Sequence, residues 1–262
     1  MFSIMRILFR NKRILWTSTL AELRNRYAGS LLGKLWILLY PALLLSIYLF
    51  VYVAIFKMRF PGQSQMDYVI FVFSGLVPYI GFMEAVSSGC MSVKQNIHLV
   101  KNVIMPIDLI PPRAVLASMV SQAVSMVILV GLTLANGSGS PHLLLLPVVF
   151  ALQILFLCGL VWILASLAVV LPDTSHFVGL FLLLLLFVSP IGFDTSMVPE
   201  QLRAVIYANP LHYMIDAYRS IILHGRLPEP FSMAIYVAIC LATFWTGATF
   251  FNKFKAILVD YE

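Results

Sequence analysis

The segment Gly29-Ser-Leu-Leu-Gly-Lys34 is the part of the sequence closest to a phosphate-binding loop. Such a loop has four residues between its glycines, and its lysine is followed by Ser or Thr, whose hydroxyl binds Mg²⁺. Here only three residues separate Gly29 from Gly33, and Leu35 follows the lysine. The segment also opens a long apolar run and follows no strand. We therefore predict that this chain does not hydrolyse ATP itself.

The other nucleophiles and metal-ligating residues lack the spacing of a catalytic or metal site. The histidines form no HExxH pair, the serines lie in no GxSxG sequence, and the three cysteines are far apart with no CxxC motif. An intramembrane hydrolase needs a nucleophile and a base that face each other, and no spacing nominates such a pair. We predict no catalytic residue, no metal site and no disulfide. The residues considered are His98, His142, His176, His212, His224, Cys90, Cys158 and Cys240.

Three ionisable residues fall within or close to apolar runs, where charge is costly and often functional. Glu84 interrupts one run, although a wet position at the end of that run explains it equally simply. Asp216 and Arg219 are three residues apart, so on a helix they share a face and are expected to pair. The same ion pair would serve a structural role, by neutralising both charges, and a gating role, so the sequence does not separate the two.

A row of aromatic residues marks the first apolar run. Trp36 and Phe56, at its two ends, fit ordinary interfacial belts. Tyr40, Tyr48 and Tyr52 are four residues apart or a multiple of four, so they form a slow spiral around a helix. Aromatic faces stack on sugar rings, which makes Trp36 and the three tyrosines candidate substrate-channel residues. Simple packing is the alternative explanation for each of them.

The composition of the chain indicates that its long apolar runs lie in a membrane. The 262 residues are 61% hydrophobic and only 11% charged, whereas soluble domains average about 25% charged residues. A bilayer core takes about 20 apolar residues per helix. The sequence therefore predicts an all-α integral membrane protein of one domain with six transmembrane helices. The expected spans are residues 31–57, 68–90, 112–135, 143–171, 176–193 and 230–252.

The basic residues predict the orientation. If the N-terminus is cytoplasmic, the cytoplasmic loops hold 12 Lys and Arg and the opposite loops hold 5, which together make the 17 of the chain. An excess on the cytoplasmic side is the usual arrangement, so both termini are expected in the cytoplasm. The net charge of +6 follows from this topology and does not indicate a nucleic-acid partner.

Two segments outside the spans have helical patterns of their own. Residues 1–28 place Arg6, Arg10 and Arg13 opposite apolar residues, which predicts an amphipathic helix lying in the membrane interface beside anionic lipid. Residues 195–226 are of intermediate polarity, and the stretch from Leu211 to Leu223, which has helical spacing, is too polar and too short to span. We expect re-entrant gate helices there, because half-inserted helices are tolerated where protein or water covers their ends.

Three motifs give the chain a family resemblance. Residues 20–41 contain R-N-R-Y-A-G-S-L-L-G-K-L-W followed by Pro41, residues 94–112 contain K-Q-N-I-H-L-V-K-N-V-I-M-P, and residues 209–219 read N-P-L-H-Y-M-I-D-A-Y-R. In this order they resemble the membrane subunits of ABC-2 type exporters, in the branch that exports capsule, O-antigen and teichoic-acid chains. Tyr79 and Met105 depart from that branch, where Trp and Phe are common.

The resemblance implies a permease subunit of the bacterial inner membrane that exports a lipid-linked polysaccharide. It implies a homodimer bound to two copies of an ATPase subunit, which would hold ATP and Mg²⁺, with no cofactor in this chain. It also implies a coupling helix at 94–108 and a gate at 195–226. The coupling residues would be Asn96, Leu99, Val100, Lys101, Ile104, Pro106 and Asp108, and the gate residues Asn209, Pro210, Asp216 and Arg219.

Two other functions remain open at this point. An ABC-2 exporter of a small molecule or lipid would share the same spans. A membrane enzyme of lipid-linked sugar assembly, or a membrane scaffold without catalytic activity, would fit the composition alone. An ATPase that co-purifies with the chain distinguishes transport from the last two.

Overall fold

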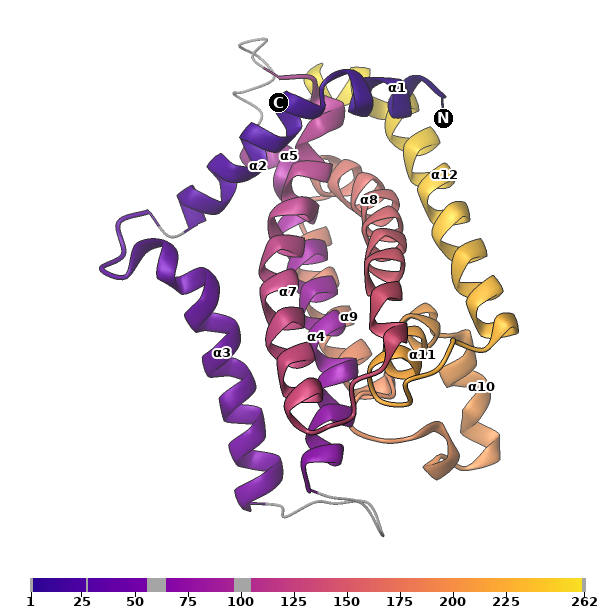
Figure 1. The fold of residues 1–262 in the computed structure, drawn as a ribbon. Helices are drawn as coiled ribbons and strands as arrows, with labels where there is room; N and C mark the ends of the chain where they lie inside the picture. Colours follow the sequence, from indigo (N-terminus) through magenta and orange to yellow (C-terminus); the bar gives the residue numbers. More distant parts are fainter. Residues whose placement is uncertain (1, 27, 56–64, 97–104, 261–262) are drawn as a thin grey trace.

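A computed structural model describes residues 2–26, 28–55, 65–96 and 105–260, and every regular element in these ranges is helical. The long helices form a bundle, with α4, α7 and α8 in its middle and α3 and α12 at opposite edges (Figure 1). Both described ends of the chain lie at the same end of the bundle. The helices are α1 (Phe2–Arg10), α2 (Lys12–Arg26), α3 (Trp36–Leu49), α4 (Gln65–Cys90), α5 (Ser92–Gln95), α7 (Ile110–Ala135), α8 (Leu146–Val170), α9 (Thr174–Val188), α10 (Glu200–Ala208), α11 (Pro210–Ile222) and α12 (Pro230–Asp260).

Short helical segments extend several of these elements. A π-helical segment, Phe50–Ile55, continues α3 directly. The 3-10 segments are η1 (Gly33–Leu35), η3 (Ile107–Leu109), η4 (Pro141–Leu145) and η5 (Thr195–Met197). Within the described residues, four helical segments are long and apolar enough to cross a membrane, namely Gln65–Cys90, Ile107–Ala135, Pro141–Val170 and Pro230–Lys255, while α3 and α9 are shorter apolar helices. The predicted all-α, multi-pass membrane class is confirmed.

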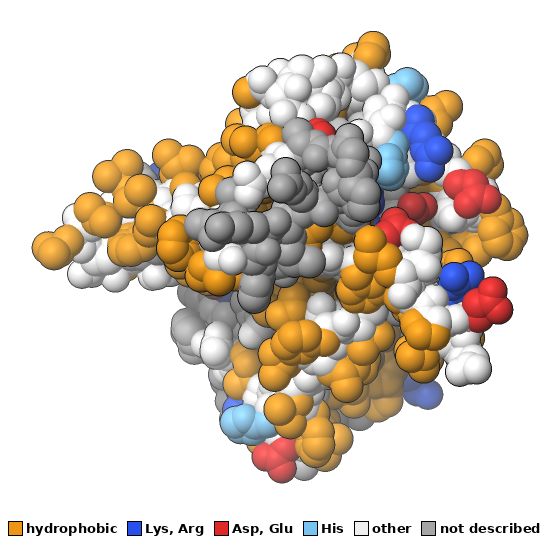
Figure 2. All heavy atoms as spheres, turned by 90° about the horizontal axis from the view of Figure 1, so that it is seen from below, with side chains coloured by type: hydrophobic (Ala, Val, Ile, Leu, Met, Phe, Trp, Pro, Cys, Tyr) orange, Lys and Arg blue, Asp and Glu red, His pale blue; other side chains and the backbone are white. Residues whose placement is uncertain are grey.

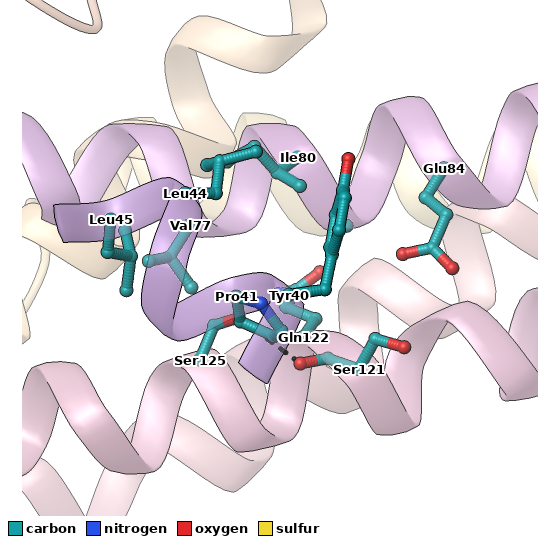
Figure 3. A pocket seen from close by; sticks show the side chains of 11 residues that line it. Tyr40, Pro41, Leu44, Leu45, Val77, Ile80, Glu84, Ser121, Gln122 and Ser125 are labelled. Atoms are coloured by element: carbon teal, nitrogen blue, oxygen red, sulfur yellow. Dashed lines mark hydrogen bonds between the residues drawn. The ribbon is translucent and has the colours of Figure 1, made fainter. Parts of the chain in front are cut away.

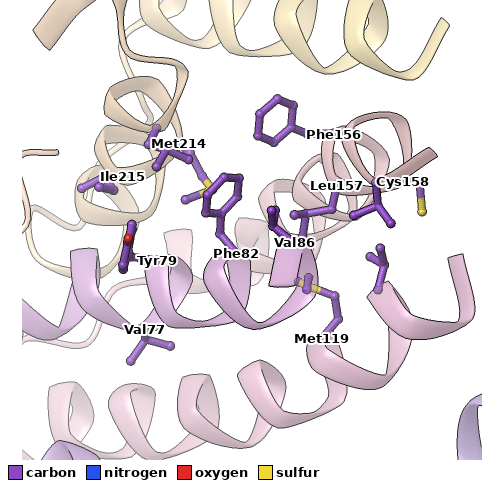
Figure 4. Close-up of a cluster of buried hydrophobic side chains, with 14 of the residues drawn as sticks. Val77, Tyr79, Phe82, Val86, Met119, Phe156, Leu157, Cys158, Met214 and Ile215 are labelled. Carbon is purple, nitrogen blue, oxygen red and sulfur yellow. The ribbon is translucent and has the colours of Figure 1, made fainter. Parts of the chain in front are cut away.

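Helix α4 forms the centre of the bundle. Of its most apolar window, 83% is buried inside the protein. Its side chains pack against those of α7, α8 and α11, and Figure 4 shows Tyr79 and Phe82 facing this cluster. The rings of Phe82 and Phe156 stack with centroids 6.1 Å apart. Offset aromatic packing of this kind fixes how α4 and α8 lie against each other.

Helices α8 and α12 make the closest approach in the bundle through glycine. A Cβ atom on Gly159 would overlap the backbone carbonyl of Thr243, and one on Gly247 would overlap the carbonyl of Gly159. Small residues at helix interfaces allow backbones to approach closely in membranes, where burial of apolar surface does not drive association. Trp162 packs beside this crossing, with its ring 5.4 Å from that of Phe244.

The N-terminal segment 1–28 contains two helices where one was expected. Helices α1 and α2 meet at Asn11, whose side-chain amide donates to the carbonyl of Ile7 at 2.9 Å. Arg6, Arg10 and Arg13 are exposed. The side chains of Ile7, Leu8 and Leu15 pack against the core. The predicted amphipathic division holds for these residues, although another apolar side chain of the segment, that of Ile14, is exposed.

The single helix expected over residues 94–108 is not continuous in the structure. Helix α5 ends at Gln95, and residues 105 and 106 are not helical, because Pro106 has extended backbone (ψ 131°) before η3 begins. Residues 97–104 lie outside the described ranges, and with them Leu99, Val100, Lys101 and Ile104.

The segment 195–226 forms two short helices, α10 and α11, after the turn η5. Asn209 caps α11, because its side-chain oxygen accepts from the N–H of Leu211 at 3.0 Å, and Pro210 takes the first helical position. Both are favoured residues at a helix start. Seen from below, charged side chains gather on the right of this end of the bundle, the side on which α10 lies in Figure 1 (Figure 2).

Candidate functional site

A cavity of about 630 Å³ lies between α2, α3, α4 and α9. This volume is within the range of small-molecule sites. One part of its lining is charged or hydroxylated, and another part is aliphatic. Such a mixture suits an amphiphilic ligand, with a charged head and a hydrocarbon tail. The lining is Arg26, Tyr40, Tyr79, Ile80, Met83, Glu84, Ser87, Ser88, Gly179, Leu182, Leu183 and Leu186.

Arg26 and Glu84 form an ion pair in the wall of this cavity. The Nη1 atom of Arg26 binds Oε1 of Glu84, and its Nη2 donates to Oγ of Ser118 at 3.1 Å and of Ser88 at 3.3 Å. The side chains are 18% and 29% exposed, so Glu84 is mostly covered, which disfavours the explanation of this residue as a wet position at the end of its run. A half-buried charge needs such a partner, because removing either charge leaves the other unpaired.

Tyr40 is the aromatic residue of α3 that reaches this site. Its side chain is 52% exposed and lines the cavity together with Glu84. Figure 3 shows its ring in the space between α3 and α4. Trp36 and Tyr48 are half-buried residues of α3 outside the cavity lining. The side chain of Tyr52 lies outside the described part. The predicted aromatic row is therefore represented at the site by one residue.

A smaller pocket of about 20 Å³ continues from Tyr40 and Glu84 toward α7, where Ser121, Gln122 and Ser125 line it (Figure 3). This volume is enough for one water molecule. The hydroxyl of Ser121 is buried there and makes no hydrogen bond within the described residues. The pocket therefore brings polar atoms to the inner face of α3.

Behind this pocket, a hydrogen-bonded network joins four helices. The amides of Gln122 and Gln153 bond to each other at 2.7 and 2.9 Å, and Gln153 Nε2 also donates to the carbonyl of Pro78 at 3.0 Å. The hydroxyl of Tyr218 donates to Oε1 of Gln153 at 2.7 Å. All four residues are buried. The network links α4, α7 and α8 to α11, so the predicted gate helix is held by the same residues that back the pocket.

Arg219 does not form the expected ion pair with Asp216 in the described structure. Its Nη2 donates to the carbonyls of Pro190 at 2.9 Å and Ile191 at 3.1 Å, and its guanidinium lies 3.7 Å from the ring centroid of Phe71. Backbone carbonyls just after the end of α9 have no partner within that helix. They can accept several hydrogen bonds from the guanidinium of Arg219, whereas α11 itself offers only the carboxylate of Asp216. Asp216 stays half-buried on α11. Arg219 therefore ties α11 to α4 and to the segment after α9.

The carboxylate of Asp194, in the same region, is held by its neighbours. Burial acts to raise its pKa, but hydrogen bonds from Ser196 and the positive charges of Arg219 and His224 outweigh burial and lower that pKa below its ordinary value. Asn209 also contributes here, because its Nδ2 donates to Oγ of Ser189 at 2.9 Å. Asn209 and Arg219, predicted as gate residues, thus both bond to the segment that follows α9.

Of the described residues predicted to couple to an ATPase, Asn96 and Asp108 contact other helices. Asn96 accepts from Nη2 of Arg113 at 2.8 Å, and the same Arg113 pairs with Glu22 of α2 at 2.9 Å. Asp108 pairs with Nζ of Lys255 in α12 at 3.1 Å, while Pro106 is exposed. These contacts join Asn96 to α7 and α2, and Asp108 to α12.

Several residues of the site were not identified from the sequence. Arg26, Glu22, Arg113 and Lys255 stand out there only as charges beside apolar runs, which served to predict topology. The available signal was their position beside a span, where a charge is expected to need a partner, but the partner itself lies far away in the sequence. Within the described residues, no group of three His, Cys, Asp or Glu side chains is placed to hold a metal ion.

Comparison with known proteins identifies the family. The model of the ABC-2 type transporter family matches residues 13–223. This chain belongs to the ABC-2 type transporter family. It is a multi-pass membrane protein and a transport subunit rather than an enzyme, as predicted.

Curated relatives of this ABC-2 transporter subunit align along almost its whole length. It is 28% identical to the O-antigen export system permease protein RfbA of Myxococcus xanthus over 256 residues, which cover 97% of this chain and 96% of the relative. A protein of the same name from Klebsiella pneumoniae is 26% identical over 89% of each chain. The polysialic acid transport protein KpsM of Escherichia coli is 25% identical over 89% of this chain and 90% of its own.

Proposed function

We propose that this chain is the membrane-spanning permease subunit of an ATP-driven ABC exporter that moves a lipid-linked polysaccharide, such as capsule or O-antigen, across the bacterial inner membrane. The observation that carries the proposal is the likeness, along nearly the whole chain, to permeases named for O-antigen export and polysialic acid transport. The cavity between α2, α3, α4 and α9 adds support. Its guanidinium, hydroxyls and aliphatic side chains match the phosphate, sugar and lipid of such a substrate.

The proposal includes six spans. Besides the four long apolar segments, α3 with its π-helical continuation and the shorter α9 would cross the membrane, and α10 and α11 would be re-entrant on the far side. The excess of Lys and Arg in the loops on the α1 side supports cytoplasmic termini. Helices α1 and α2 would then lie in the cytoplasmic interface, with Arg6, Arg10 and Arg13 toward lipid headgroups or water.

The assembly that we propose contains two copies of this chain and two ATPase subunits that bind ATP and Mg²⁺. Residues 94–108 would contact the ATPase, through Leu99, Val100, Lys101, Ile104 and the exposed Pro106. Asn96 and Asp108 would hold the two ends of this segment through Arg113 and Lys255. Asn209, Pro210, Asp216 and Arg219 would form the gate on the far side.

Within this exporter, the Arg26–Glu84 pair would decide when the cavity accepts a charged head. A phosphate offers a guanidinium the same two-pronged geometry as a carboxylate. A lipid phosphate would therefore compete with Glu84 for Arg26, and Glu84 would weaken binding by occupying the guanidinium beforehand. The hydroxyls of Ser88 and Ser118 already accept hydrogen bonds from Arg26 and would stay in place.

The deciding experiment removes each charge in turn in the source bacterium. Deletion of the gene should remove surface polysaccharide, and the wild-type gene should restore it. Arg26→Gln should lower export about tenfold or more per folded protein, since a hydrogen bond between charged groups contributes about 1.5–3 kcal/mol. Glu84→Gln should keep export at or above the wild-type level. Surface polysaccharide and folded membrane protein are measured together.

A matched control is the exposed pair Arg203 and Glu200, which are 4.0 Å apart at the other end of the bundle. Arg203→Gln should export normally. Unchanged surface polysaccharide after gene deletion would reject the polysaccharide function. Normal export by Arg26→Gln at normal protein level would reject only the role of the cavity.

A further inference from the structure

The bundle has a second large hollow, far from the cavity at Arg26, between the early parts of α8 and α12. These helices touch backbone to backbone at Gly159 and Gly247, near the middle of each, and they separate toward the lower end in Figure 1. The wedge between them is a groove of about 630 Å³. Its floor is deepened by Ala234 and Ala238, one turn apart on α12.

The groove has the length and polarity of one membrane leaflet. Its lining runs along α12 from Pro230 to Leu241, which at 1.5 Å per residue is about 16 Å. Half of a hydrocarbon core of about 30 Å is about 15 Å. Every side chain in the lining is apolar, including Leu145 of η4, Val148 of α8 and Ile221 of α11. The wedge therefore fits an acyl chain and offers nothing to a polar ligand along its length.

The outer rim of the groove carries one charge of each sign. The rim residues Leu227, Pro228 and Pro230 line the groove, and the exposed Arg226 and Glu229 lie between and beside them in the chain. The guanidinium of Arg226 makes no hydrogen bond or ion pair within the part of the chain that the structure describes. Among the described residues, the carboxylate of Glu229 accepts only from the hydroxyl of Ser232, at 3.2 Å.

Backbone contacts hold this rim in place. Gly225 adopts a positive φ of 56°, and its carbonyl accepts from Oγ of Ser140 at 3.1 Å. The N–H of Arg226 donates to the carbonyl of Ser220 at 3.0 Å. The two charges are therefore presented by a loop that is fixed both to α11 and to the segment before α8, at the end of the groove where a lipid headgroup would lie.

From these observations we propose that the α8–α12 groove binds one phospholipid with a primary-ammonium headgroup, of the phosphatidylethanolamine type. One acyl chain fills the wedge, the phosphate binds Arg226, and the ammonium binds Glu229. Phosphatidylglycerol has no cation for Glu229, and phosphatidylcholine has no N–H to donate to it. Because Ile221 and the Gly225 turn belong to the groove and its rim, the bound lipid supports the end of α11.

The test uses the full chain in nanodiscs that contain equal parts of dioleoyl phosphatidylethanolamine, phosphatidylglycerol and phosphatidylcholine. Native mass spectrometry after extraction should find one phosphatidylethanolamine retained per chain. Ala238→Trp, at an exposed position, should lose it by filling the wedge. Arg226→Gln should reduce retention about tenfold, as expected for a hydrogen bond between charged groups. Leu184→Trp, on the exposed face of α9, is the control and should retain the lipid.

Equal retention of the three lipids by the wild type would overturn the headgroup assignment, and full retention by Ala238→Trp would overturn the site. A change from dimer to monomer in Ala238→Trp would show that a second copy of the chain covers the groove, which also rejects the proposal. Arg226→Gln changes only an exposed side chain, so it tests the site even where Ala238→Trp fails to fold. None of these outcomes depends on what the protein exports.

Discussion

Helix α4 is enclosed by the bundle, whereas α3 lies at its edge beside α7 with much of its surface uncovered (Figure 1). On α3, Leu38, Leu43 and Ile47 are more than half exposed. On α4, side chains are buried almost all the way around from Tyr68 to Tyr79. Both helices are apolar and both contain a proline, so neither hydropathy nor proline accounts for the difference.

Small residues account for the difference in burial between α4 and α3. Gly75, Gly81 and Gly89 of α4 each lie against a side chain of a neighbouring helix, with no room for a Cβ atom that does not press on it. The segment Trp36–Leu49 contains no glycine, and leucine is its most common residue. Membrane helices pack closely where small residues let backbones approach. Hence α4 is packed closely against its neighbours on several sides, whereas α3 is held in the bundle by few contacts.

The largest expected effect comes from closing the space at Gly81. Its Cβ would overlap the side chain of Gln122, so Gly81→Val should lower the free energy of unfolding by about 1–3 kcal/mol through overpacking, and by about 1–3 kcal/mol more if the Gln122 network breaks. Gly131→Val, on α7 in open space, is the matched control and should be nearly neutral. Unfolding in detergent micelles measures both. Equal stability of the two variants would remove packing as the explanation of the comparison.

An intermediate effect is expected from the polar network behind α4. Gln153→Leu leaves the hydroxyl of Tyr218 and the amide of Gln122 without their partner, which should cost about 1–2 kcal/mol of unfolding free energy. Gln201→Leu, exposed on α10, serves as the control and should change little. The double variant Gln122→Leu with Gln153→Leu should cost less than the sum of the single changes, because it leaves fewer unpaired groups. Strict additivity would contradict the network.

The smallest effect on stability is expected at Tyr40 of α3. Tyr40→Phe should leave both stability and export unchanged, because the ring is kept and its face remains free for sugar. Tyr40→Ala should reduce export at unchanged protein level. Tyr79→Phe on α4, whose hydroxyl donates to the carbonyl of Leu182, should instead lose about 0.6 kcal/mol of unfolding free energy. Export that falls only in step with protein level in Tyr40→Ala would make this ring a packing residue.

The sequence was informative about elements and poor on their contacts. The apolar runs located the long helices, and the expected spans 68–90 and 112–135 lie within the helical segments Gln65–Cys90 and Ile107–Ala135. Asn209 and Pro210 marked the start of α11, since cap and first-turn preferences are local. The family motifs, spread from residue 20 to residue 219, led to the transport function.

Partners that are distant in the sequence were not predictable. Arg26 and Glu84 are 58 residues apart, and only the fold brings them together. The expected pairing of Asp216 with Arg219 was wrong because local spacing shows which side chains share a face, but not which carbonyls a neighbouring segment offers. Likewise, the pattern over 94–108 predicted one continuous helix. In the described residues Pro106 has an extended backbone, so the helix is interrupted there.

The contacts of Asn96 and Asp108 have a mechanical consequence. Asn96 bonds to Arg113, which pairs with Glu22 of α2, and Asp108 pairs with Lys255 of α12. A displacement of either residue would therefore pull on α2, α7 and α12. Helix α3, which few contacts hold, would follow such a movement least, so the space beside Tyr40 would change in width.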